Sequence, residues 1–230
     1  MTIRHPVLTL AALVTITLAG LCASAPARAQ QAPAAGQKTG SATLGYTRVL
    51  KGSSPEYIAI TVNEDGTGTY DGREISTPPK PVAFKLSAAT TERLFSLAAA
   101  LNNFHSIDLE SHKRVANLGA KTFTYTRDGK QSSATFNYTR LKEAQALTEI
   151  FDGISAVEQH VQTLQYAIKY DPLALPNDLL RVQVDLANKA LADPEMMVPT
   201  LEQITRNPRF LHLAKMRAQD ILQQVQSTNR

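Results

Sequence analysis

Hydrophobic and polar residues alternate most clearly over residues 57–72, where the chain reads YIAITVNEDGTGTYDG. Aliphatic side chains occupy every second position in the first half of this segment, which is the period of a strand with one buried face. These side chains are Ile58, Ile60 and Val62. The Asp65-Gly66 pair then supplies a turn, so the segment is predicted to form a β-hairpin.

Two turn lengths fit this hairpin, and they place opposite side chains in the core. A two-residue turn sets Val62 opposite Thr69. A three-residue turn, with Gly66 left-handed in a bulge, sets Val62 opposite Gly68 and puts Tyr70 on the aliphatic face. Only the longer turn groups the tyrosine with the aliphatic residues. We therefore predict that Tyr70 is buried and Thr69 is exposed.

The same periodicities predict an α+β domain over residues 43–170. The expected elements are strands over 43–50 and 82–86, a helix over 88–102, an extended segment from 104, a hairpin over 121–138 and a helix over 141–168. Ser87 is a good N-cap for the first helix. A two-residue turn is favoured in the second hairpin because it aligns Phe123 with Ala134. Gly153 weakens the long helix by about 1 kcal/mol relative to alanine.

Helix-start signals after residue 170 indicate a small all-α domain over 171–228. The expected boundary lies at Asp171-Pro172 and Pro176, followed by helices over 179–191, over 194–206 and after Asn207-Pro208. Asp193 is expected to cap the second helix, and Pro199 to kink it. The predicted fold is thus α+β, with a largely antiparallel sheet of two hairpins covered by two helices and followed by this helical domain.

The first 29 residues have the pattern of a signal peptide. An apolar run over 7–21 precedes small residues at 27–29, where signal peptidase cleaves. Residues 30–42 read as a disordered linker. We therefore expect an exported chain, periplasmic or secreted, with no membrane span once the signal peptide is removed.

Charge and cysteine content narrow the possible functions. The chain has 24 basic and 20 acidic residues, and loss of Arg4 and Arg28 with the signal peptide leaves 22 against 20. So small an excess argues against nucleic acid as a partner. The only cysteine is Cys22. The exported part would therefore have neither disulfides nor thiol chemistry.

Residues 52–57 (GSSPEY) and the DGTGTYDG hairpin over 65–72 resemble a bacterial family of exported domains of unknown function. Its hallmark is a G-x-C-P-x-Y strand start followed by a D-G-x-x-x-Y-x-G hairpin, and the likeness covers about 43 to 160. Ser54 stands where the family has cysteine, so no role of that cysteine carries over. The resemblance implies a small envelope domain without an established activity.

The tail is similar, more weakly, to one HEAT-type helix pair. The residues concerned are Pro194 to Met197, Asn207-Pro208, Ala214, Arg217, Ala218, Ile221 and Leu222. Such repeats bury their core against neighbouring repeats. A single pair would have to dock on the sheet domain, on the helix before it or on a partner.

One cluster has the residue types of a metal site, namely His105, Asp108, Glu110 and His112. In a strand, the last three would share the face opposite Ile107, which predicts a solvated edge. No metal or cofactor site is therefore assigned.

The candidate nucleophiles and bases lack catalytic spacing. Ser53 and Ser54 have no G-x-S-x-G turn around them and no spaced partner, so they are interpreted as loop serines. His160 and His212 are expected at helix surfaces, and Asp193 is expected to pair with Arg217. Two basic groupings are interpreted as solvated faces: Lys113, Arg114, Lys121, Arg127 and Lys130, and Arg206, Arg209, Lys215 and Arg217.

We therefore expect a non-enzymatic exported protein that binds another envelope protein, through the tail helices or an open sheet edge. An exposed apolar strip on the tail would support this hypothesis. One alternative is an inhibitor of an envelope or foreign hydrolase that inserts the 76–81 loop into the active site, which a protruding, ordered loop would favour. Another is a hydrolase with a site assembled from distant residues, which a deep pocket holding a carboxylate or histidine of strongly shifted pKa would favour.

Overall fold

A computed structural model describes residues 41–228. The predicted signal peptide and most of the predicted linker lie outside this range. The strands are β1 (Thr43–Val49), β2 (Tyr57–Asn63), β3 (Thr67–Arg73), β4 (Val82–Lys85), β5 (Ala120–Arg127) and β6 (Lys130–Phe136). The α-helices are α1 (Ala88–Ala100), α2 (Lys142–Tyr170), α3 (Leu175–Ala187), α4 (Val198–Arg206) and α5 (His212–Thr228), and two 3-10 helices are η1 (Asn102–Phe104) and η2 (Pro194–Met197). The predicted α+β fold is confirmed.

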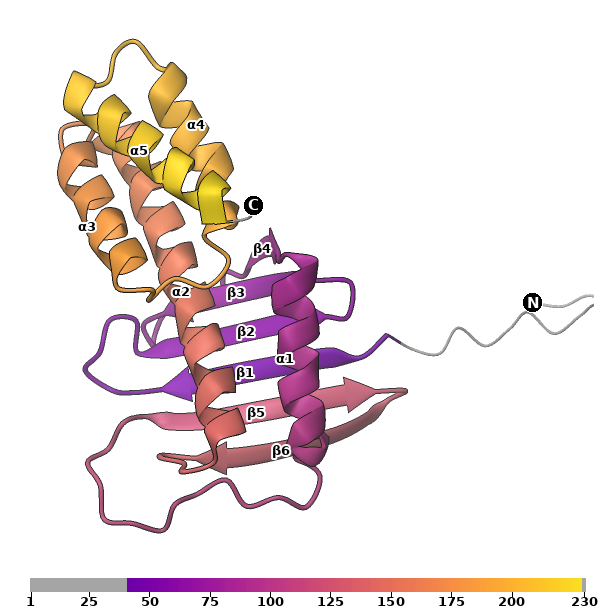
Figure 1. Ribbon diagram of the computed structural model, residues 1–230. Helices are drawn as coiled ribbons and strands as arrows, with labels where there is room; N and C mark the ends of the chain where they lie inside the picture. The colour runs from indigo at the N-terminus through magenta and orange to yellow at the C-terminus, as the bar shows by residue number, and fades with distance from the viewer. Residues whose placement is uncertain (1–40, 229–230) are drawn as a thin grey trace, which may run out of the picture. The chain divides into compact units, whose positions relative to one another are not determined.

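The strands form one six-stranded antiparallel sheet in the order β4-β3-β2-β1-β5-β6. Helices α1 and α2 cross one face of it (Figure 1). Strands β4 and β6 are the two edges, so among the described residues each has one side without a neighbouring strand. None of the helices described between residues 41 and 228 combines the length and the apolar character that a membrane span requires.

The first hairpin has the predicted three-residue turn. Val62 lies opposite Gly68 and Ile60 opposite Tyr70, and Gly66 has a φ of 83°. Tyr70 is buried at 1% exposure, and Thr69 is exposed. A Cβ at Gly68 would lie 2.6 Å from the ring of Phe84, so the glycine makes room for that ring. The register prediction is confirmed.

The second hairpin is also confirmed, with Phe123 opposite Ala134. Asp128 and Gly129 both have positive φ, as a two-residue turn matched to the strand twist requires. Phe123 lies near the centre of the core beneath α1 and α2. The ring of Tyr46 stacks on that of Phe151 from α2, with centroids 5.0 Å apart.

Helix α2 contributes to two hydrophobic cores, and it forms without a break over nearly the predicted span. Leu147, Phe151 and Ile154 pack against the sheet. Further along, Val157 and Leu164 pack with α3, α4 and α5. The tail helices thus dock on the second half of α2.

Gly153 lies where the chain after α3 passes α2. A Cβ at this position would meet both the Cβ and the backbone nitrogen of Ala192 at 2.8 Å. The glycine therefore does more than weaken the helix, because its missing side chain allows two segments to approach closely.

Several predicted boundaries are wrong in the tail. Helix α3 begins at Leu175 and ends at Ala187, four residues earlier at each end than expected, because Pro176 lies in its first turn, where a missing N–H is harmless. Pro199 does not kink a helix; residues 194–197 form η2, and α4 begins just before the proline. The last helix begins only at His212.

The expected extended segment after residue 104 forms no strand in the described chain. Phe104 belongs to η1 and is buried, and Leu109 is buried as well. These side chains contribute to the core without pairing of their backbone in the sheet.

Candidate functional site

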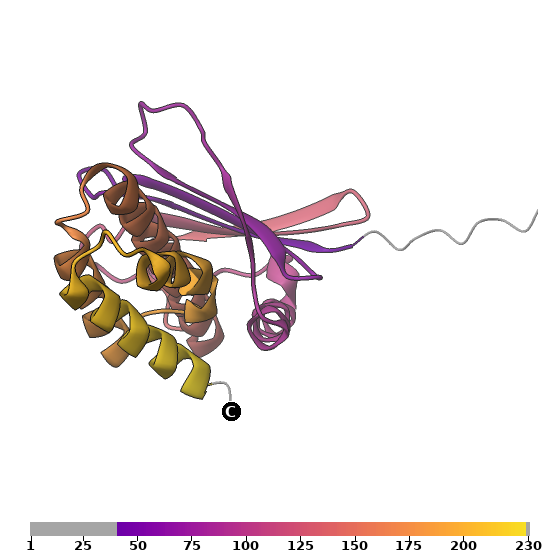
Figure 2. The same ribbon diagram turned by 90° about the horizontal axis from the view of Figure 1, so that it is seen from above.

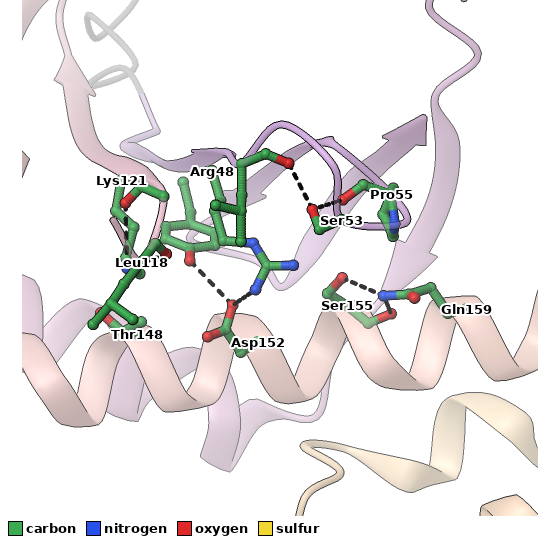
Figure 3. Close-up of polar contacts among 12 residues, drawn as sticks. Arg48, Ser53, Pro55, Leu118, Lys121, Thr148, Asp152, Ser155 and Gln159 are labelled. Carbon is green, nitrogen blue, oxygen red and sulfur yellow. Dashed lines mark hydrogen bonds and ion pairs between the residues drawn. The ribbon is translucent and has the colours of Figure 1, made fainter. Parts of the chain in front are cut away.

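Asp152, in the middle of α2, is the centre of a polar cluster on the covered face of the sheet. The hydroxyl of Tyr46 donates to Asp152 Oδ1 over 3.1 Å, and Arg48 Nη1 donates to the same oxygen over 3.3 Å (Figure 3). Tyr46 and Arg48 are two residues apart on β1, so both side chains point to the same face. The cluster therefore joins β1 to α2.

The electrostatics of this cluster favour a structural role. Burial raises the pKa of the Asp152 carboxyl, while the Arg48 charge and the Tyr46 hydrogen bond act in the opposite direction. Burial, followed by the negative charge of Asp152, raises the pKa of Tyr46 far above its ordinary value. The phenol therefore stays protonated and remains a donor to the carboxylate.

Lys121 lies close to this cluster, and its ammonium group is fully engaged. It donates to the backbone oxygens of Leu118 (3.1 Å), Gly119 (3.4 Å) and Asn137 (3.1 Å). Burial lowers its pKa. The sequence pattern places Lys121 on a solvated basic face; this prediction is wrong, because the residue is buried and fixes the loop before β5.

A second chain of hydrogen bonds continues along α2. Ser155 donates to the Tyr70 hydroxyl over 3.4 Å, and Gln159 Nε2 donates to Ser155 Oγ over 2.9 Å. Figure 3 shows the Ser155 and Gln159 side chains next to each other on the helix. These groups bind one another and hold α2 against β3.

A groove of about 490 Å³ lies between strand β4 and the tail helices. One wall is the segment 82–87, and the other is formed by α2, η2 and α4. The residues on the second wall are Glu158, Val161, Gln165, Asp193, Glu195, Met196, Pro199 and Thr200.

The groove differs from the Asp152 cluster because one of its carboxyl groups, on Glu158, has no hydrogen-bond partner among the described residues. The Glu158 side chain is only 4% exposed, and burial raises its pKa to about 7. Within the described chain its carboxyl makes no hydrogen bond or ion pair. Every fully buried polar side-chain atom in residues 41–228 has a hydrogen-bond partner, so the Glu158 oxygens reach the water of the groove, where they are open to a ligand. A carboxyl of raised pKa in a groove is the feature that the hydrolase alternative predicts, and as a general acid or base it would have to lie within hydrogen-bond reach of a substrate proton.

Asp193 is not the cap that its sequence context predicts. Its carboxylate accepts from the backbone nitrogen of Ser87 (2.5 Å) and from the hydroxyl of Thr90 (3.1 Å), at the start of α1. It makes no capping bond to η2 and has left-handed backbone angles. The predicted pair with Arg217 is also wrong, because that guanidinium donates to the backbone oxygen of Pro176. Ser87 caps α1 as predicted.

The metal-like cluster does not converge. His112 and Asp108 form an exposed pair at 2.7 Å, whereas Glu110 accepts from the backbone nitrogen of Asn137 at 2.6 Å. The hydrogen bond and charge of Asp108 raise the pKa of His112. Over residues 41–228, no group of three or more candidate ligands could hold a metal ion.

The remaining candidates serve the fold. The Ser53 hydroxyl lies 2.7 Å from the backbone oxygen of Leu50 and 2.8 Å from that of Pro55, so it closes its own loop (Figure 3). His160 lies 2.8 Å from Asp185 and links α2 to α3, while His212 is exposed at the start of α5.

Two of the arginines in the basic groupings pair with carboxylates. Arg127 pairs with Glu64, and Arg206 pairs with Glu202 one helical turn before it. Neither guanidinium belongs to a converging cationic site.

The sequence does not identify Glu158 as a candidate site residue. It flanks the apolar stripe of its helix, and no neighbouring residue indicates that the tail covers it.

No known protein-family model matches this chain, and no curated protein matches it either.

Proposed function

We propose that this chain is a non-catalytic module that binds another protein through its helical tail. The observation that carries the proposal is a set of large apolar side chains that the tail helices and the end of α2 leave exposed. The set comprises Tyr166, Tyr170, Leu173, Leu180, Val184, Leu211, Leu213 and Met216. The tail buries its own core and still presents these side chains to water.

The most exposed members lie close in sequence where α2 ends. Tyr166 and Tyr170 are one helical turn apart, with ring centroids at 5.0 Å, and Leu173 lies in the turn that joins α2 to α3. Their exposures are 63%, 61% and 74%. We call these three residues the α2-end patch. Tyrosine is enriched at the energetic centres of protein interfaces, because it buries a large area and keeps a polar group in reach of solvent.

A second exposed group borders the same end of the tail. The hydrogen bond from Arg217 to Pro176 brings the early part of α5 against the start of α3. Leu213 and Met216 lie in that early part and are about half exposed. Apolar side chains gathered at one end of a domain are typical of a contact surface. The partner we expect is an envelope protein, in keeping with the predicted signal peptide.

Affinity capture with matched variants tests this proposal. The chain without its predicted signal peptide would be immobilised and exposed to envelope extract, and bound proteins identified by mass spectrometry. The patch variant is Tyr170→Ser with Leu173→Ser. The control is Ile75→Ser with Val115→Ser, which removes apolar side chains exposed by about 40% in loops of the sheet domain.

The expected result is one protein recovered by the wild type and the control and lost with the patch variant. Equal recovery from all three proteins would refute the α2-end patch as the contact.

The inhibitor remains a second candidate, because the loop between β3 and β4 is exposed and anchored. Residues 76–81 are all exposed, and the loop stands away from the sheet in Figure 2. The Arg73 guanidinium donates to the backbone oxygens of Ile75 and Thr77, and Lys80 N donates to Asp71. Inhibition of a panel of envelope hydrolases, lost when residues 77–80 are replaced by glycine and serine, would support this candidate. Unchanged hydrolase rates would exclude it for that panel.

A further inference from the structure

We propose that the groove beside β4 binds an extended segment of a partner protein, which adds to the sheet as a strand and places a lysine or arginine against Glu158. This inference rests on the proposed function in that the ligand is a protein. It uses a different surface from the α2-end patch, so the two can fail separately.

The free side of β4 is the first wall of this site. Leu86 N donates to the backbone oxygen of Gly66 on the β3 side, and Phe84 lies opposite Gly68. Backbone groups alternate in an antiparallel ladder, so the N–H and C=O of Ala83 and Lys85 point away from β3. Such an unpaired row is the template on which peptides add as an extra strand.

Helix α2 forms the roof of the site because it runs on beyond the sheet edge. Its contacts follow the strand order: Asp152 binds Tyr46 of β1, and Ser155 binds Tyr70 of β3. Glu158 and the residues after it then line the groove together with β4. Figure 1 shows α2 crossing the strands and continuing into the tail. An added strand would therefore run beneath the segment of α2 that begins at Glu158.

The charge of the groove selects the side chain that the peptide would supply. Three carboxylates line it, from Glu158, Asp193 and Glu195, against the single cation of Lys85. Asp193 is already held by the start of α1. Glu158 is more than nine-tenths buried and has no partner within residues 41–228. A cationic side chain would give it the charge-assisted hydrogen bond that it lacks.

The apolar part of the groove fits the neighbouring side chains of a strand. Val82 lies opposite Tyr70 and shares its face, yet remains 38% exposed. Met196 and Pro199 border the groove on the tail side. Alternating pockets for apolar and basic side chains, combined with backbone pairing, are how sheet edges read extended peptides.

Selection from a random seven-residue peptide display library tests this inference. The chain without its predicted signal peptide would be the target at pH 8, above the pKa of Glu158. One enriched peptide would then be labelled, and its affinity measured by fluorescence anisotropy for the wild type, Glu158→Gln, Ala83→Pro and the control Glu149→Gln. Proline at Ala83 removes an outward N–H without breaking the β3 ladder. Glu149 is an exposed glutamate on the same helix.

The expected peptides share one lysine or arginine with apolar or β-branched residues two positions away. We expect Glu158→Gln and Ala83→Pro each to weaken binding by about tenfold or more, and Glu149→Gln to leave it unchanged. Replacing the basic residue of the peptide by norleucine should give a similar loss, and that loss should disappear in Glu158→Gln. The α2-end patch variant should bind the peptide normally.

Three results would overturn the inference. They are an absence of enriched peptides, enrichment of peptides without a basic residue, and affinities unaffected by Glu158→Gln. Sedimentation velocity adds a fourth: if the chain dimerises and Ala83→Pro abolishes the dimer, the occupant of the edge is a second copy. Failure of the capture experiment with peptide binding intact would remove only the α2-end patch.

Discussion

The unpaired carboxyl of Glu158 leads to a sharp prediction about stability and pH. Burial raises its pKa from an ordinary value of 4.5 to about 7 in the folded chain. The folded state therefore holds this proton more tightly than the unfolded state. The resulting stability is fully present below the unfolded pKa and is lost as pH rises through the folded pKa. The window for Glu158 thus runs from about pH 4.5 to just above 7.

The size of the effect follows from the two pKa values. They differ by about 2.5, and each pKa unit corresponds to about 1.4 kcal/mol, so the wild type loses about 3 kcal/mol across the window. Glu158→Gln keeps the shape of the side chain and cannot ionise. The neighbouring charges of Lys85, Asp193 and Glu195 are common to both proteins. The variant should therefore gain about 3 kcal/mol relative to the wild type between pH 4.5 and pH 8.5.

Urea unfolding followed by circular dichroism at these two pH values measures the gain. Glu149→Gln is the matched control, because it removes an exposed carboxylate from the same helix and should show no such pH-dependent difference. If wild type and Glu158→Gln differ by the same free energy at both pH values, the carboxyl is not desolvated and the reasoning is wrong.

Three further changes test the packing. Gly153→Ala should lower the free energy of unfolding by about 1–3 kcal/mol, although alanine favours a helix, because its methyl group would overlap Ala192; a more stable variant would contradict this. Asp193→Ala should cost about 1–2 kcal/mol and speed amide hydrogen exchange in the first turn of α1, whereas unchanged exchange would show that the carboxylate does not hold that turn. Asp152→Ala should cost about 1–3 kcal/mol by leaving the Tyr46 hydroxyl without its acceptor; in a double-mutant cycle with Tyr46→Phe, strictly additive losses would mean that the bond contributes nothing.

Both hairpins could be predicted because their registers depend on nearby residues. Tyr70 and Gly68 identify one face of the first hairpin, and the Asp128-Gly129 turn fixes the second. In each case the sequence neighbours that set the turn are also the neighbours in space. Helix α2 could be predicted in the same way, from the helical spacing of its apolar residues.

The groove and its carboxylates could not be predicted, because they depend on contacts between distant parts of the chain. Asp193 precedes a proline, which is a helix-start pattern, yet it binds Ser87 more than a hundred residues away. Glu158 lies beside the stripe of an amphipathic helix, where glutamate is ordinary. Only the return of the tail over α2 buries it, and no local pattern encodes that return. The predicted start of α3 is wrong because the prediction places Pro176 in the boundary loop, whereas a proline fits the first turn of a helix equally well.

The continuity of α2 has a consequence for how the protein can be divided. This helix of 29 residues is about 43 Å long. It contributes hydrophobic side chains to both hydrophobic cores without a break in its backbone. A fragment cut after Asp171 would carry Val157 and Leu164 into water and invite aggregation. A fragment that begins there would lack the surface of α2 against which α3, α4 and α5 pack. Shortening the protein for crystallisation or for fusion should therefore keep the whole of α2.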